Sequence, residues 1–150
     1  MKVVLDTNVL ASGTLNAQTP PGQLLDAWRE RAFDLVISQY ILDELAETLQ
    51  APYFQARTTA GQRAAFLQLL RDEAILTAIA VDVAGAATHP EDDLILATAV
   101  SAQADYLITG DRPLINTLSG SFRGVQLLTP RAFLDMLHAA ERWPTFHPMS

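Results

Sequence analysis

The stretch VVLDTN at residues 3–8 indicates the fold class, because a short apolar run ends directly in a carboxylate. An apolar run without alternation of polar residues is typical of a parallel strand that is covered by helices on both faces. We therefore predict a first strand at Lys2–Leu5, with Asp6 at its carboxyl end. Parallel α/β sheets bind their ligands at this edge.

Outside this stretch, predicted strands and helices alternate along the chain. Four further strands are predicted at residues 33–37, 78–83, 106–109 and 125–128. Helices are predicted after the breaker Thr19–Gly22 and from Ser38, Thr59, Asp92 and Thr129. Ser38 is a good N-cap, and Thr59 with Gln62 three residues later forms a capping box. The alternation predicts a three-layer α/β/α domain with a central parallel sheet of about five strands.

Length and composition favour one globular unit. The chain has 150 residues, of which 49% are hydrophobic and 18% charged, and this is too short for two ordinary domains. We predict a single domain over 1–150, with a core to about residue 140 and an irregular tail at 141–150. The chain has no cysteine, which excludes a disulfide framework and a zinc–thiolate site. No signal pattern and no apolar run of ~20 residues is present, so we expect a cytoplasmic protein without a membrane segment.

Four acidic residues lie where such a fold delivers side chains to one edge of its sheet. They are Asp6, Glu44, Asp92 and Asp111. Each alone could be an ordinary turn residue or helix cap. Asp92, however, shares the apolar stripe of its predicted helix with Ile95 and Leu96. A carboxylate on a buried stripe needs a partner, and Mg²⁺ or Mn²⁺ suits a set of carboxylates and water.

The chain resembles the PIN domain in four segments that occur in order at matching spacings. These are LDTN at 5–8, Glu44 within ILDEL at 41–45, DDLILATA at 92–99 and DYLITGD at 105–111. The PIN domain is the fold of many metal-dependent ribonucleases, including the VapC-type toxins of bacterial toxin–antitoxin pairs. The resemblance extends to about Leu137, and the variant PEDD at 90–93 is similar to a branch of presumed toxin components.

The resemblance implies a site and an activity. The acidic metal site would comprise Asp6, Glu44, Asp92 and Asp111, which would also be the catalytic residues. Asn8 and Thr109 would support it, and Asp93 is a possible fifth acid. The expected function is an Mg²⁺- or Mn²⁺-dependent endoribonuclease, the toxin of a type II pair with RNA as substrate, a small antitoxin as partner and a homodimeric state. His89 departs from the branch, whose members often carry an acid before the proline.

Other functions remain in competition with this hypothesis. The net charge of −7 is unusual for a nucleic-acid binder, although nine of the ten basic residues are arginines, which suit phosphate contacts. A PIN-fold binding module without hydrolytic activity is the main alternative. A haloacid-dehalogenase-type phosphatase would need an aspartate in place of Asn8. A response-regulator receiver would need a lysine after its last strand, and Lys2 is the only lysine.

The adjacent acids Asp92 and Asp93 are predicted to differ in role. Consecutive helix residues point about 100° apart, so the two side chains cannot face the sheet edge equally. The register of Ile95, Leu96 and Ala99 places Asp92 on the inward stripe and turns Asp93 away from it. We therefore expect Asp92 to serve the site and Asp93 to act at most as a helix-terminal charge or a distant water ligand.

Overall fold

The structure is a computed structural model that describes residues 1–87 and 89–140. The predicted irregular tail at 141–150 lies outside the described residues. The strands are β1 (Lys2–Leu5), β2 (Asp34–Ile37), β3 (Ile75–Leu76), β4 (Tyr106–Ile108), β5 (Ser121–Phe122) and β6 (Val125–Leu128). The helices are α1 (Thr7–Gly13), α2 (Pro20–Arg29), α3 (Gln39–Leu49), α4 (Pro52–Gln55), α5 (Ala60–Glu73), α6 (Pro90–Ser101), α7 (Arg112–Thr117) and α8 (Pro130–Ala139).

The strands form one six-stranded sheet in the order β3-β2-β1-β4-β6-β5. All neighbours are parallel except β5, which pairs antiparallel with β6. The order reverses at β1, whose neighbours β2 and β4 are reached by separate crossovers. The carboxyl ends of β1 and β4 therefore lie side by side, and this is the position at which open α/β sheets bind ligands.

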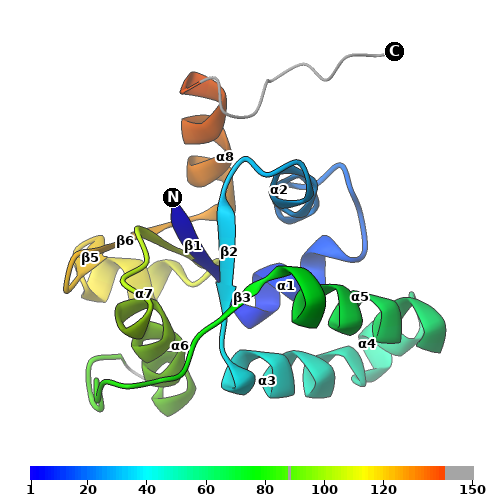
Figure 1. Ribbon diagram of the computed structural model, residues 1–150, viewed down its shortest axis with the longest axis horizontal. Coiled ribbons are helices and arrows are strands. Elements are labelled where there is room, and N and C mark those ends of the chain that lie inside the picture. Colours follow the sequence, from blue (N-terminus) through cyan, green and yellow to red (C-terminus); the bar gives the residue numbers. More distant parts are fainter. Residues whose placement is uncertain (88, 141–150) are drawn as a thin grey trace.

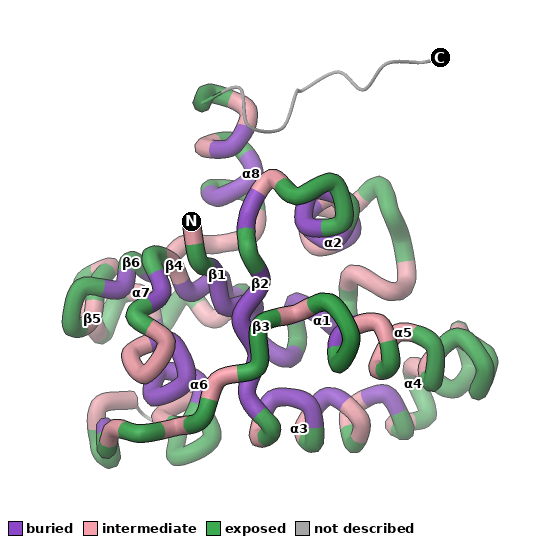
Figure 2. Tube along the Cα trace, in the orientation of Figure 1, coloured by how far each residue is buried: buried purple, intermediate pink, exposed green. Residues whose placement is uncertain are grey.

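Helices cover both faces of this sheet, as the predicted three-layer α/β/α class requires. Figure 1 shows α1, α2 and α5 on one side and α6 and α7 on the other. Val3, Val4 and Leu5 of β1 are at most 1% exposed, which agrees with the continuous apolar run in the sequence. Figure 2 shows buried residues along β1 and β2 and on parts of most helices, whereas the edge strand β3 is exposed and α5 is largely so.

Local hydrogen bonds confirm the predicted starts of α3, α5 and α8. The Ser38 hydroxyl accepts from the backbone amide of Ile41 at 3.3 Å and caps α3. Thr59 and Gln62 form the complete capping box at the start of α5. The Thr129 hydroxyl caps α8 in the same way. Each cap satisfies an amide that has no partner inside its own helix.

The predicted strand at 78–83 is wrong. The observed strand β3 is Ile75–Leu76, which pairs with Val36 and Ile37 of β2. β2 ends at Ile37 because the next residue, Ser38, caps α3. Residues 78–83 therefore have no neighbouring strand to pair with, and they form an irregular connection with a bend at Val81.

Several short elements were not predicted from the sequence. They are α1, α4, α7 and the antiparallel strand β5. The helix predicted from Asp92 begins two residues earlier, because Pro90 occupies its first turn, where a missing amide is tolerated. Within residues 1–87 and 89–140, no helix has the length and apolar character that crossing a membrane demands.

Candidate functional site

Asp6 is the one buried charged residue in the described part of the chain, with 8% of its surface exposed. It follows β1 directly, and its backbone amide donates to the Ile108 carbonyl at 2.9 Å. The fully buried Thr109 hydroxyl donates to Oδ2 of Asp6 at 2.8 Å and accepts from the Asp111 amide at 3.0 Å. Thr109 thus links the two acids that follow the central strands, in the supporting place expected for it.

Glu44 is held by two hydroxyl groups that sequence reasoning missed. The Thr7 hydroxyl donates to one carboxylate oxygen, and the Tyr40 hydroxyl donates to the other at 2.8 Å. Tyr40 precedes Glu44 by four residues on α3, so the two side chains share a helix face. In the sequence, this four-residue spacing was the indication that Tyr40 and Glu44 could be in contact. Burial, followed by the hydrogen bond to Glu44, raises the pKa of the Tyr40 phenol and keeps it a donor.

Asp111 has a structural contact as well as a place at the sheet edge. Its Oδ1 accepts from the Leu114 amide at 3.1 Å, so it is the N-cap of α7. From the sequence, the alternative role for Asp111 was that of an ordinary turn residue, whereas the structure shows a helix cap. This contact does not exclude a second role. One carboxylate oxygen remains without an intramolecular partner among the described residues.

Asp92 and Asp93 point to different surroundings. Asp92 lines the same pocket as Asp6 and Asp111. Asp93 accepts from the backbone amides of Gly85 at 2.9 Å and Ala87 at 2.7 Å, and it lines a separate apolar pocket. Asp93 therefore fastens the connection before α6 to the start of that helix.

A buried hydrogen bond also joins the helices that carry Glu44 and Asp92. Thr98 of α6 is fully buried, and its hydroxyl donates to the Ser38 hydroxyl at 2.8 Å. Ser38 is itself the cap of α3. The bond therefore fixes the start of the Glu44 helix against the middle of the Asp92 helix.

The predicted acids line a single pocket of about 590 Å³ at the carboxyl edge of the sheet. Its walls are Asp6, Thr7, Asn8, Glu44, Thr48, His89, Glu91, Asp92, Ile95, Gly110 and Asp111. None of these is a lysine or arginine. In residues 1–87 and 89–140, ion pairs join only Met1 to Asp34 and Arg131 to Asp135, outside this pocket. We call this space the acidic pocket.

The acidic pocket disfavours negative charge when no cation is bound. Burial raises the pKa of Asp6 to about 6, and the nearby Asp92 and Glu44 charges add to this although the Thr109 hydrogen bond opposes it. Burial likewise raises the pKa of Asp92, with contributions from Asp111 and Glu91. Two separate carboxyls that resist ionisation are typical of a site in which a positive ion belongs.

The carboxylates line the pocket without closing around one point. Among the residues described, no three Asp, Glu or His side chains are arranged so that they could hold a metal ion as they stand. Glu44 is engaged by Thr7 and Tyr40, and Asp111 by Leu114. The five carboxylates and the absence of a lining lysine or arginine fit a hard divalent cation, whereas the side-chain positions would have to adjust to one.

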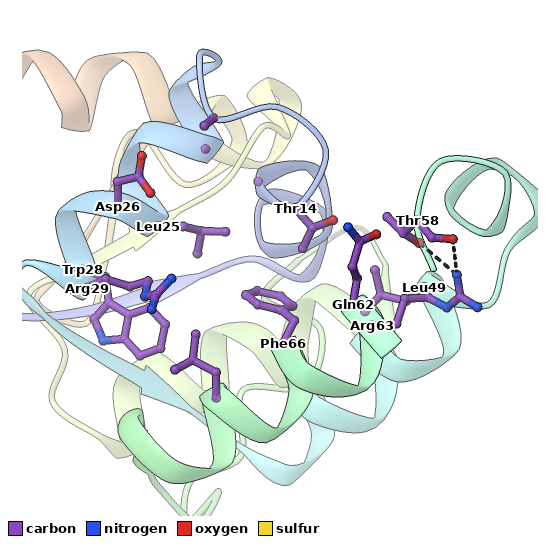
Figure 3. A pocket seen from close by; sticks show the side chains of 14 residues that line it. Thr14, Leu25, Asp26, Trp28, Arg29, Leu49, Thr58, Gln62, Arg63 and Phe66 are labelled. Atoms are coloured by element: carbon purple, nitrogen blue, oxygen red, sulfur yellow. Dashed lines mark hydrogen bonds between the residues drawn. The ribbon is translucent and has the colours of Figure 1, made fainter. Parts of the chain in front are cut away.

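Figure 3 shows a second pocket of about 260 Å³, between α2 and α5. Leu25, Trp28 and Phe66 give it an apolar lining, and its one carboxylate, Asp26, is accompanied by arginines. An apolar pocket of mixed charge does not suit a divalent cation. Of the two pockets, the acidic pocket is the one whose lining suits a divalent cation.

Comparison with known proteins gives a family match and similarities to solved structures, two of which are described here. The family model described as PIN domain matches residues 2–113. One similar structure is that of VapBC2 from Rickettsia felis bound to a promoter DNA fragment. A chain of it is 16% identical in sequence to this chain and superposes with a TM-score of 0.54. Another is the structure of FitAcB from Neisseria gonorrhoeae, with a chain that is 17% identical and has a TM-score of 0.54. Each alignment covers 86% of this chain and 98% of the other chain. These similarities show a shared fold, and no curated protein matches the chain.

Proposed function

This chain belongs to the PIN domain family, and from this premise we propose that it is a divalent-metal-dependent endoribonuclease that hydrolyses RNA phosphodiesters. The observation that carries the proposal is the acidic pocket at the carboxyl ends of β1 and β4, lined by five carboxylates and no lysine or arginine. The test is cleavage of a generic single-stranded RNA by the purified chain, which should require Mg²⁺ or Mn²⁺ and stop on addition of EDTA.

We assign the metal to Asp6, Glu44, Asp92 and Asp111. A divalent cation at this site would orient the scissile phosphate and lower the pKa of the attacking water. Thr109 holds the Asp6 carboxylate in place, while Thr7 and Tyr40 hold that of Glu44. Asn8 is exposed at the rim and can donate to a phosphate oxygen of the substrate.

We expect Mn²⁺ to stabilise the folded protein. A cation that binds the native pocket and not the unfolded chain raises the free energy of unfolding by about 1–3 kcal/mol at 10–100 times its dissociation constant. For a chain of this length that is a rise of roughly 3–10 °C in melting temperature. Asp6→Asn should remove most of the rise, whereas Asp135→Asn, an exposed acid on α8, should keep it. A melting temperature indifferent to both Mn²⁺ and Mg²⁺ would count against the metal site.

We further propose that the chain is the toxin of a toxin–antitoxin pair and forms a homodimer. The resemblance to VapC-type toxins and the fold shared with the VapBC2 chain support the pairing. The exposed helix α5 and the exposed Ile75 and Leu76 of β3 provide surface that a second copy can cover. Size-exclusion chromatography with light scattering should give a dimer for the chain alone. Co-expression with a small protein encoded beside it should give a larger stable complex; a monomer in both cases would overturn the two proposals.

A binding module without hydrolytic activity is the second candidate. The observation in its favour is that no three described acidic or histidine side chains close around a common point. Such a module would bind RNA in EDTA and leave it intact in Mn²⁺. Cleavage that depends on Mn²⁺ and disappears in Asp6→Asn would exclude it.

A further inference from the structure

Charge is unevenly distributed along this acidic chain. Residues 48–71 contain three arginines and no aspartate or glutamate, so the segment carries +3 while the rest of the chain carries −10. The segment spans the end of α3, all of α4 and most of α5. We call residues 52–71, from the start of α4 to Arg71 in α5, the arm. A basic arm on a protein of net charge −7 is a surface on which a polyanion can bind without strong repulsion.

Tyr53 and Arg57 form a stacked pair on the exposed side of α4. Tyr53 is 54% exposed, and it is one of four large apolar or aromatic residues in the described part of the chain that are exposed to solvent. The Arg57 guanidinium lies 3.7 Å from the centre of the Tyr53 ring, and its Nη1 donates to the Tyr53 carbonyl at 2.9 Å. The pair therefore presents a flat aromatic surface next to a fixed positive charge.

The pair is mounted on a well-ordered turn. Phe54 lies edge-on to Tyr53 with ring centres 5.2 Å apart, and it packs against the hydrophobic core. The Thr58 hydroxyl donates to the Phe54 carbonyl at 2.7 Å, and Arg63 donates to the carbonyl and hydroxyl of Thr58 at 2.8 and 2.9 Å (Figure 3). The stacked surface is thus pre-organised, which reduces the entropy lost when a ligand binds.

The arm begins where the acidic pocket ends. Thr48, in the last turn of α3, lines that pocket, and α4 starts at Pro52 after a connection of two residues. Figure 1 shows α4 at the end of α3 that is remote from the sheet, with α5 returning beside α3 toward β3. A strand of nucleic acid that leaves the acidic pocket along α3 would therefore reach Tyr53.

We propose that Tyr53 and Arg57 form a binding site for an unpaired nucleobase of single-stranded RNA. The inference rests on the proposed nuclease function and adds the form of its substrate. Aromatic rings with a neighbouring arginine stack on bases of any sequence, and the arginine also attracts the phosphate backbone. In a duplex the faces of each base are covered by its stacked neighbours, so the site selects single-stranded regions. The acidic pocket is lined by no arginine or lysine, and the arm supplies positive charge next to it.

Fluorescence anisotropy with a labelled single-stranded RNA of about 12 nucleotides tests the site. The measurement is made on the full chain in EDTA, so that binding is recorded independently of cleavage. Tyr53→Ala should raise Kd by about 5- to 100-fold, the range for one stacked base, and Tyr53→Phe should restore affinity. Arg57→Ala should weaken binding and reduce the slope of log K against log salt by about 0.7. An oligomer with abasic sugars throughout should bind weakly and be insensitive to Tyr53→Ala.

Arg123 supplies a matched control. It is also an exposed arginine near an aromatic ring, 5.0 Å from the centre of Phe122, but it follows β5 at the opposite edge of the sheet. Arg123→Ala should leave RNA affinity unchanged. Equal affinity of Tyr53→Ala and the unmodified chain would overturn the inference. So would a change from dimer to monomer in light scattering of Tyr53→Ala, because the surface would then join two copies. An RNA that binds through Tyr53 and is never cleaved in Mn²⁺ would support this site and refute the nuclease.

Discussion

Asp92→Asn should lower the rate of metal-dependent RNA cleavage by about 100- to 1000-fold, whereas Asp93→Asn should retain a substantial fraction of it. The Asp92 side chain lines the acidic pocket, where asparagine offers a neutral ligand in place of a charged one. Losing one preorganised electrostatic contact at a reacting centre has an effect of this size. Asp93 instead accepts from the amides of Gly85 and Ala87, outside that pocket.

Thermal melting in EDTA separates the two aspartates further. Asp92→Asn relieves repulsion from Asp111 and Glu91 and should not lower the melting temperature. Asp93→Asn leaves only one oxygen to accept from two amides, so it should lower the melting temperature by a few degrees through an unsatisfied donor. Equal loss of cleavage in the two variants, with both folded, would show that both acids serve the chemistry.

Asp6→Asn should stabilise the metal-free protein above pH 6 by about 2–3 kcal/mol. The folded state raises the pKa of Asp6 from 3.8 to about 6, and each pH unit of displacement corresponds to about 1.4 kcal/mol. Below pH 3.8 the Asp6 carboxyl is protonated in both the folded and the unfolded chain. Burying it in this neutral form then does not reduce the free energy of unfolding. The free energy of unfolding falls as the pH rises toward about 6, because ionisation of Asp6 is easier in the unfolded chain than in the buried site. Asparagine does not ionise, and its side-chain oxygen can still accept from Thr109.

Urea unfolding in EDTA at pH 4 and at pH 7.5 measures this difference. The two proteins should be close in stability at pH 4, and the variant should be the more stable at pH 7.5. Mn²⁺ at 100 times its Kd at pH 7.5 should remove most of this difference, because only the unmodified chain gains the full stabilisation of the cation. Asp34→Asn, an exposed acid, should behave as the unmodified chain at both pH values. If Asp6→Asn is less stable than the unmodified chain at pH 7.5 in EDTA, the prediction is wrong. Other groups in the folded protein would then stabilise the ionised carboxylate.

The predicted fold class was confirmed because the strongest sequence signals were those of buried strands and capped helices. The run before Asp6 has no polar residue on either face, so a strand covered on both sides was the interpretation that fitted best. Ser38 and Thr59 could be placed because a cap depends on neighbours three residues away. The third strand could not be placed, since its position depends on where β2 ends, about 40 residues earlier. Pairing between distant segments leaves no local signal.

The sequence predicted that the four acids would lie at one edge of the sheet, and they do line one pocket, but it could not predict the contacts that hold them. Helix geometry alone separated the surroundings of Asp92 and Asp93, because a stripe of Ile95 and Leu96 fixes the register. The roles of Thr7 and Tyr40 as donors to Glu44 depend on rotamers, for which the sequence offers only the four-residue spacing on α3. The stacked pair of Tyr53 and Arg57 has the same spacing, but nothing in the pattern shows that its surface stays exposed.

The position of β1 in the centre of the sheet has a consequence for how the protein folds. β1 is first in the chain, yet one of its two neighbours, β4, follows about a hundred residues later. The hydrogen bond between Asp6 and Thr109 spans 103 residues. Closing so long a loop is entropically unfavourable, and contacts of this kind slow folding. During synthesis the acidic pocket therefore assembles late, and a chain interrupted before β4 carries Asp6, Glu44 and Asp92 without the strand that brings them together.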